Sequence, residues 1–148
     1  FLIPYLDADR YYGVDEEKSL VDAALKHEVP ANIAKQKKPR FAFNSDFTFD
    51  FLETFDVAWA NSVITHLGED MTALCLRKLR QKAKPTSRFF FTYWKGTLQR
   101  DIPYHPNLDY RIMPERLGEI GQDTGWMMTD IGNWDHPRNQ LMMLATPI

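Results

Sequence analysis

Residues 55–67 read FDVAWANSVITHL, the segment of the sequence that is most indicative of the fold. Its apolar run ends in the polar pair Asn61 and Ser62, a pattern typical of a buried strand that ends at a cleft. An amphipathic helix is expected over 68–84, and the apolar run RFFFTYW that starts at Arg88 predicts a second strand, covered on both faces. Two such strands joined by a helix form a parallel unit, so the stretch predicts an α/β fold.

Outside this unit, hydrophobic spacing and turn residues predict the remaining elements. One helix is expected over 16–28 and another over 115–124, where Pro114 suits a helix start and Gly125 a helix end. Further strands are expected over 10–14, 41–47, 126–131 and 140–146. Loops or turns are expected over 31–39, 48–54, 85–87, 95–113 and 132–139, with 95–113 read as a long loop or lid.

Composition limits the class of protein. The 148 residues fit one domain, and a 44% hydrophobic content can build a core. The net charge of −2, with no basic stripe, argues against nucleic acid as a partner. No apolar run has the roughly 20 residues that a membrane span needs, so no membrane is expected. The single cysteine, Cys75, cannot form an internal disulfide, which makes a reduced, cytoplasmic setting the default expectation.

The order of these motifs resembles a known family. FDVAWANSVITHL, a leucine-spaced helix and then KPTSRFFFTY are similar to the later part of class I S-adenosylmethionine-dependent methyltransferases. The resemblance implies a Rossmann-like, mostly parallel sheet with helices on both faces and an antiparallel carboxyl-terminal strand pair. It also implies S-adenosylmethionine as the cofactor and a small molecule as the methyl acceptor.

One family feature has no counterpart near the start of the chain. The family places its first strand and a glycine-rich loop directly before the segment that FLIPYL, residues 1–6, resembles. We therefore expect 1–148 to be a single methyltransferase-like domain that lacks this strand and loop. Open strand edges would favour association into a homo-oligomer. The alternative is a non-catalytic, methyltransferase-like binding or oligomerisation module.

A third possibility, a nucleotide-dependent oxidoreductase, needs a G-x-G-x-x-G motif that the sequence does not contain. The sequence also has no G-x-S-x-G elbow of serine hydrolases and no glycine–lysine motif of P-loop proteins.

Two acidic positions are candidates for binding the adenosine part of the cofactor. Asp15 ends a predicted strand, and the resemblance makes it the ligand of the ribose hydroxyls; the alternative is a helix cap. By the same resemblance, Asp46 accepts a hydrogen bond from the adenine amino group and Phe47 covers the ring. The alternative is a turn aspartate beside a core phenylalanine.

Asn61 and Ser62 follow the buried strand, and the resemblance places them beside the methionine part of the cofactor. Alternatively, both side chains only bond to the local backbone. His66 could act as a general base, since its ordinary pKa is near 6.5, although tying down a loop is the plainer role. Methyl transfer needs mainly alignment of the reacting atoms, so no protein base is obligatory.

Aromatic and basic residues late in the chain could line a pocket for the acceptor, with ordinary loop packing as the alternative. They are Tyr93, Trp94, Tyr104, His105, Trp134, His136 and Arg138. His105 and His136 lack neighbours at metal-ligand spacing, so we expect no metal site.

Overall fold

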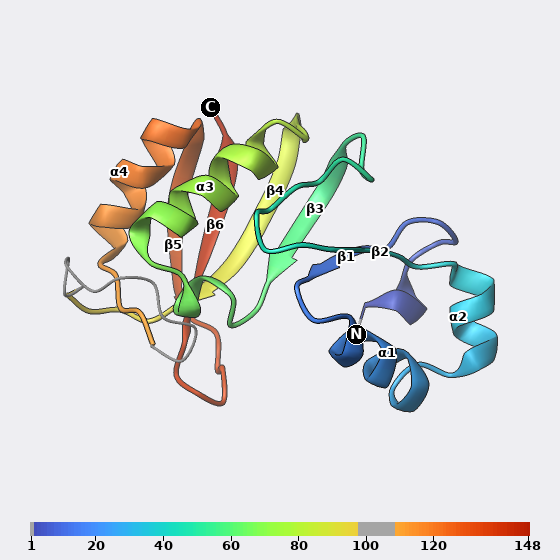
Figure 1. Ribbon diagram of the computed structural model, residues 1–148. Helices are drawn as coiled ribbons and strands as arrows, with labels where there is room; N and C mark the ends of the chain where they lie inside the picture. The colour runs from blue at the N-terminus through green and yellow to red at the C-terminus, as the bar shows by residue number, and fades with distance from the viewer. Residues whose placement is uncertain (1, 98–108) are drawn as a thin grey trace. The chain divides into compact units, whose positions relative to one another are not determined.

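The computed structural model describes residues 2–97 and 109–148 (Figure 1). The chain divides into two compact units, 1–52 and 53–148, which are taken in turn. The expected single-domain organisation stays a prediction.

The first unit is built on two short parallel strands, β1 (Tyr12–Asp15) and β2 (Arg40–Phe43). Parallel strands need a crossover connection, and α1 (Lys18–His27) and α2 (Ala31–Lys37) supply it. A short 3-10 helix, η1 (Ile3–Tyr5), precedes β1. Among residues 2–52, the buried apolar side chains are those of Ile3, Val29 and Leu52, so the core described for this unit is small.

Helix α2 occupies a region where the sequence predicts a loop or short turn, and that prediction was wrong. The backbone N–H groups of Ile33 and Ala34 both donate to the Pro30 carbonyl, which starts the helix. The helix ends at Lys38, whose φ of 50° is left-handed. The basic composition of the segment suggested a loop, but it equally suits a short exposed helix.

The second unit contains a four-stranded sheet in the order β3-β4-β6-β5. Its strands are β3 (Phe55–Ala60), β4 (Ala83–Tyr93), β5 (Trp126–Asn133) and β6 (Leu141–Pro147). β3 and β4 are parallel, joined through η2 (Ile64–His66) and α3 (Glu69–Arg80). β6 pairs antiparallel with both β4 and β5, and α4 (Pro114–Thr124) leads into β5. The predicted α/β class and the antiparallel carboxyl-terminal strand pair are therefore confirmed.

Strand β4 begins earlier than the sequence predicts, because the expected turn at 85–87 lies inside it. The pairing with β3 jumps from Phe55 opposite Ala83 to Val57 opposite Arg88, so the extra residues of β4 form a bulge. Ser87 holds this bulge: its hydroxyl donates to the Phe55 carbonyl and accepts from the Lys84 N–H. A bulge accommodates Pro85, which has no N–H to give to a sheet.

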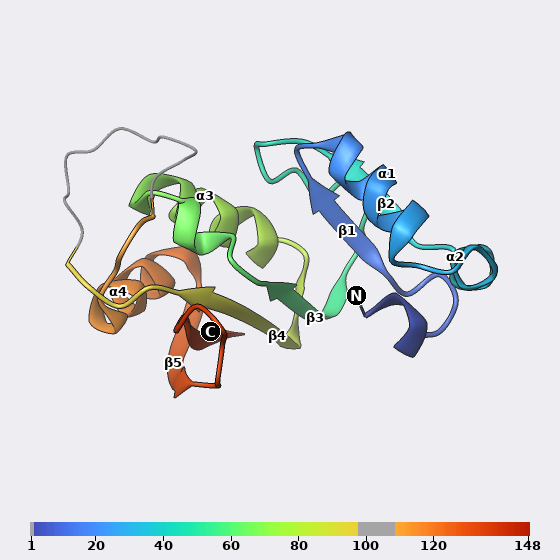
Figure 2. The ribbon, with the colours of Figure 1, turned by 90° about the horizontal axis from the view of Figure 1, so that it is seen from below.

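Both helices of this unit lie on the same side of its sheet, as Figures 1 and 2 show. On that side, the indole Nε1 of the fully buried Trp126 donates to the Leu76 carbonyl of α3 at 3.0 Å. Helix α4 approaches β5 closely at Gly121, where a Cβ atom would lie 2.8 Å from the Trp126 carbonyl oxygen. The core of the unit therefore lies between this sheet face and the two helices.

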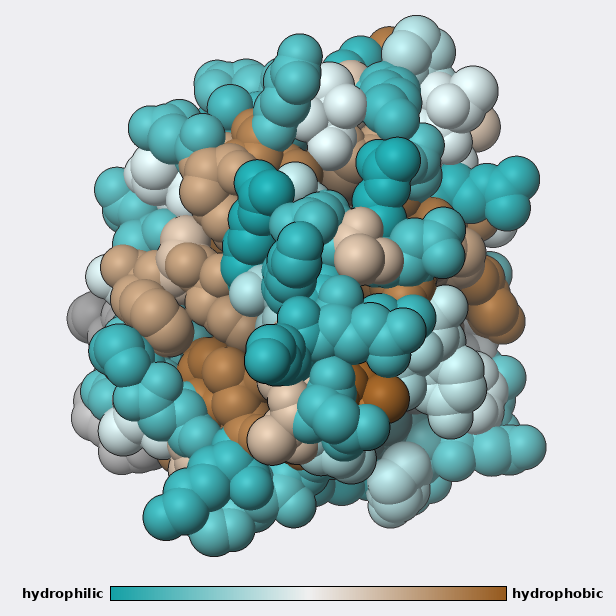
Figure 3. Space-filling model, turned by 90° about the vertical axis from the view of Figure 1, so that its right-hand side faces the viewer, coloured by the Kyte–Doolittle hydropathy of each residue, from teal (hydrophilic) through white to brown (hydrophobic). Residues whose placement is uncertain are grey.

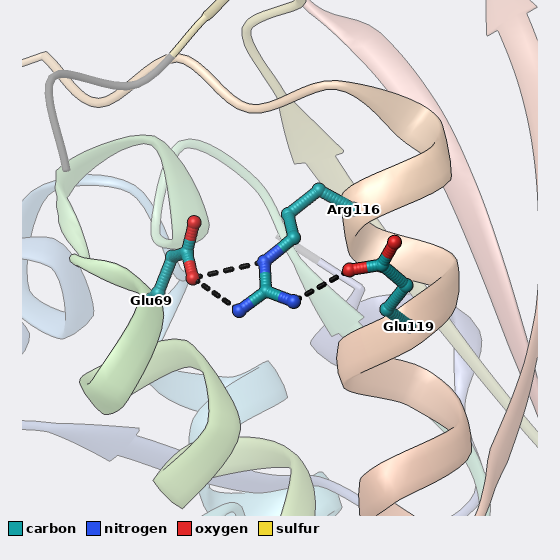
Figure 4. A network of polar contacts seen from close by, with 3 residues as sticks. All are labelled: Glu69, Arg116 and Glu119. Atoms are coloured by element: carbon teal, nitrogen blue, oxygen red, sulfur yellow. Dashed lines mark hydrogen bonds and ion pairs between the residues drawn. The ribbon is translucent and has the colours of Figure 1, made fainter.

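An ion-pair cluster joins the two helices (Figure 4). Arg116 of α4 donates from Nε and Nη2 to the same Glu69 carboxylate oxygen of α3, at 3.0 and 2.7 Å. Its Nη1 binds Glu119 one turn further along α4. All three side chains remain partly exposed, so the cluster aligns the helices more than it stabilises the fold.

The opposite face of the same sheet carries large apolar side chains that stay exposed or half-buried. Trp59, Phe90 and Leu144 form one row across β3, β4 and β6, because residues paired across strands share a face. Val57 is 61% exposed, Trp59 46% and Met127 58%. Figure 3, a view of another side of the molecule, also shows apolar side chains at the surface among hydrophilic ones.

Candidate functional site

In the first unit, Asp15 lies at the carboxyl end of β1, beside the end of β2. Its exposed carboxylate accepts a hydrogen bond from the Glu17 N–H at 2.9 Å, just before α1 begins. Its carbonyl accepts from the Asn44 N–H at 3.2 Å, which ties the two strand ends together. The carboxylate thus helps to turn the chain into the helix, and it remains exposed to solvent.

A tight turn follows β2 and contains Asp46 and Phe47. The Thr48 N–H is shared between Asp46 Oδ1 and Asn44 Oδ1, each at 3.1 Å. Asn44 Nδ2 donates to the Thr48 carbonyl at 3.0 Å. Phe47 has a left-handed φ of 56° and is half-buried. The predicted strand over 41–47 therefore ends at Phe43, and both candidate residues belong to the turn after it, where a turn aspartate is also expected.

In the second unit, Asn61 and Ser62 directly follow β3, as the sequence predicts. Asn61 is exposed. Ser62 has a left-handed φ of 57° and turns inward: its N–H donates to Thr92 Oγ1 at 2.7 Å, and its hydroxyl donates to Gln140 Oε1 at 3.0 Å. The two neighbours thus differ, since one side chain faces solvent and the other is engaged inside the unit.

His66 ends η2 and lies near Asp109. Its Nδ1 is 3.7 Å from Asp109 Oδ1, an ion pair only when the imidazole is protonated and too long for a hydrogen bond. The Tyr110 N–H donates to the neighbouring Thr65 carbonyl at 2.7 Å. These contacts attach the segment after residue 108 to η2, which agrees with a loop-tying role and leaves a role in proton transfer untested.

The aromatic residues proposed to line an acceptor pocket do not all lie on the same face of the sheet. Trp134 packs edge-on against Trp59, with ring centroids 5.6 Å apart, and its ring is tilted by 36° against that of His136, with centroids 5.3 Å apart. Tyr93 instead points to the helix-covered face, where its hydroxyl donates to Asp130 at 2.8 Å. Burial and the Asp130 carboxylate both raise the pKa of Tyr93, so it stays a neutral donor. Tyr104 and His105 lie outside the described residues.

Sequence reasoning missed Thr92 and Gln140, the partners of Ser62. Both are buried, at 0% and 1% exposure. A threonine inside the apolar run RFFFTYW was the available signal, because a buried hydroxyl needs a hydrogen-bond partner. Gln140 gave no comparable signal, since its partner lies 78 positions away in the chain.

Neither a metal site nor a membrane span emerges from the part of the chain that the structure describes. Within residues 2–97 and 109–148, no three histidine, cysteine or acidic side chains group to hold a metal ion. None of the helices in these ranges is long and apolar enough to cross a membrane.

Sequence comparison identifies no relative: no protein-family model and no curated protein matches the chain. Solved structures do match. Magnesium protoporphyrin IX methyltransferase of Synechocystis, solved with bound S-adenosylmethionine, is 15% identical with a TM-score of 0.68, over 93% of this chain and 59% of its own. A Burkholderia thailandensis 1,6-didemethyltoxoflavin-N1-methyltransferase is 17% identical with a TM-score of 0.63, over 92% of this chain and 70% of its own.

Human N-acetylserotonin methyltransferase, in complex with S-adenosylmethionine, is 15% identical with a TM-score of 0.63, over 92% of this chain and 40% of its own. The chain thus spans between 40% and 70% of the length of these three proteins. At such low identity the likeness shows the fold alone. The chain has the Rossmann-like α/β fold of S-adenosylmethionine-dependent methyltransferases.

Proposed function

We propose that this chain is part of a cytoplasmic S-adenosylmethionine-dependent methyltransferase that acts on a small-molecule acceptor. One observation carries the proposal: the fold matches that of several small-molecule methyltransferases over more than 90% of the chain. Polar residues at the carboxyl ends of β1, β2 and β3 support it, because open α/β folds bind ligands at these ends.

The residues at the end of β1 and after β2 fit the adenosine part of such a cofactor. Asp15 is proposed to accept hydrogen bonds from the ribose hydroxyls, and its exposed carboxylate has the acceptor capacity for a diol. Asp46 is proposed to accept from the adenine amino group. Phe47, half-buried in the same turn, is proposed to cover the ring.

In the second unit, Asn61 and Ser62 form the turn proposed to lie beside the methionine part. The cofactor supplies an electrophilic methyl group, and the protein's task is to align the acceptor with it. His66 is proposed as a general base for acceptors that must lose a proton, a role that other acceptors would not require.

The test is calorimetric titration of the chain with S-adenosylhomocysteine. We expect saturable binding, weakened about tenfold or more by Asp15→Ala and by Asp46→Ala, because each removes a charged hydrogen-bond acceptor. Asp22→Ala is the matched control: Asp22 pairs with Lys18 on the exposed side of α1, so its loss should leave the affinity unchanged. Equal loss in all three variants would count against the assigned roles.

The alternative function is a non-catalytic binding or oligomerisation module, and the exposed sheet face favours it. Val57, Trp59 and Met127 present apolar surface of the kind that marks interaction sites. A chain that is folded by circular dichroism yet shows no binding of S-adenosylhomocysteine would support this alternative over the enzyme.

A further inference from the structure

Three polar residues from separate parts of the second unit meet at the end of β3. Ser62 follows β3, Thr92 lies near the end of β4, and Gln140 directly precedes β6. Thr92 and Gln140 are 0% and 1% exposed, and the Ser62 N–H and hydroxyl bond to them at 2.7 and 3.0 Å. A buried polar network of this kind is rigid. If one of its hydrogen bonds broke, the buried groups would have neither a protein partner nor water to bond to.

The network holds a backbone conformation that serine does not favour. The φ of Ser62 is 57°, in the left-handed region that costs a residue with a Cβ atom free energy. Such a conformation persists where surrounding contacts fix it, and it is frequent at functional sites. Here one contact fixes the backbone N–H and the other fixes the side chain, so both Thr92 and Gln140 are needed to hold the turn.

We propose that Ser62 is a positioning residue, and that Thr92 and Gln140 act through it to present Asn61 to the methionine part of the cofactor. The inference rests on the proposed function. Both polar groups of Ser62 are engaged within the protein, whereas the exposed Asn61 amide can donate to a carboxylate and accept from an ammonium group. Thr92 and Gln140 thus govern affinity without contacting the ligand.

The first arm of the test compares Thr92→Val, which keeps the shape and removes the acceptor, with Thr92→Ser, which keeps the acceptor. We expect Thr92→Val to weaken binding of S-adenosylhomocysteine about tenfold and Thr92→Ser to restore it to within about twofold. Thr129→Val is the matched control, since Thr129 is exposed on β5 of the same sheet. The affinity of this variant for S-adenosylhomocysteine should equal that of the original chain.

The second arm is a double-mutant cycle of Ser62→Ala and Gln140→Met. If Ser62 acts through Gln140, the double variant binds no more weakly than the weaker single variant, because both changes break one network. The opposite outcome is that the losses of affinity from Ser62→Ala and Gln140→Met add in the double variant, and that Thr92→Val has the same affinity as the original chain. This outcome would show that Ser62 contacts the ligand directly, and it would overturn the proposal. Should Thr92→Val fail to fold, this cycle alone decides.

A third arm needs no cofactor. Amide hydrogen exchange of Ser62 in the unliganded chain should be at least about tenfold faster in Thr92→Val than in Thr92→Ser, because the Ser62 N–H has lost its acceptor. Equal exchange rates would overturn the positioning role whatever the chain binds. If the two Thr92 variants show the exchange difference but the original chain does not bind S-adenosylhomocysteine, the positioning role stands and the proposed function is refuted, and with it the link to the cofactor.

Discussion

At the scale of single residues, burial sets the chemistry of the only cysteine. Cys75 is a buried residue of α3. Its burial raises the pKa of the thiol from 9.0 to about 12. A thiol that stays protonated is a poor nucleophile, so Cys75 behaves as a small apolar side chain in the folded chain.

This burial predicts a pH-dependent loss of stability. Between pH 9 and 12, Cys75 ionises in the unfolded chain but keeps its proton in the folded chain. The contribution of the buried thiol to the free energy of unfolding is therefore intact below pH 9 and falls as the pH rises. We expect the free energy of unfolding to fall by about 1.4 kcal/mol per pH unit more in the original chain than in Cys75→Ala. Urea titrations from pH 8 to 11 measure the difference, and parallel curves would contradict it.

The cysteine-free variant is needed because burial also raises the pKa values of Tyr11 and Tyr93. Both tyrosines remain in Cys75→Ala, so their alkaline effects cancel in the comparison. Only the difference between the two curves belongs to Cys75.

At the scale of elements, helix α4 provides two glycines in different surroundings. A Cβ atom at Gly121 would lie 2.6 Å from Met128 Cγ and 2.8 Å from the Trp126 carbonyl oxygen, whereas one at Gly118 would meet nothing within 4 Å. The close packing of α4 on β5 therefore depends on one glycine and not on the other.

We expect Gly121→Ala to lower the free energy of unfolding by about 1–3 kcal/mol, because a backbone oxygen cannot move aside as a side chain can. Gly118→Ala is the matched control and should raise it by about 0.5–1 kcal/mol, since alanine favours helix over glycine. Urea unfolding of both variants gives the values. Equal effects would mean that α4 does not pack on β5 as described.

Elements with strong periodicity could be predicted from the sequence, and elements set by distant contacts could not. Helix α3 has an apolar face and an acidic start, so local pattern located it. Pro85 suggested a turn, but Ser87 and the Phe55 carbonyl, 32 positions apart, make room for it inside β4. Ser62 was visible as a polar residue after a strand, whereas its engagement by Gln140 depends on β6 lying next to β4.

At the scale of the whole molecule, the open sheet face has consequences for solution behaviour. Trp59, Phe90 and Leu144 form a row on the face that α3 and α4 leave uncovered. Trp59 is exposed and its two neighbours in the row are half-buried. Adjacent apolar side chains that remain in contact with water promote association, because burying them releases water from apolar surface.

We therefore expect this chain to self-associate with increasing concentration, and Trp59→Lys to weaken that association at least about tenfold. Sedimentation velocity over a range of concentrations measures it. Gln122→Lys adds the same charge on the exposed surface of α4 and should change the association little. If both variants associate alike, net charge and not the sheet face controls the behaviour.

The contrast between Trp59 and Trp126 gives the fold two optical reporters. Trp126 is fully buried and bonded to the Leu76 carbonyl, so its fluorescence should be blue-shifted and shielded from iodide. Trp59, on the opposite face of the same sheet, is 46% exposed and accessible to the quencher. Variants that retain only one of the chain's four tryptophans, either Trp59 or Trp126, would let the open and the covered face be followed separately, by light alone, as the protein unfolds or meets a partner.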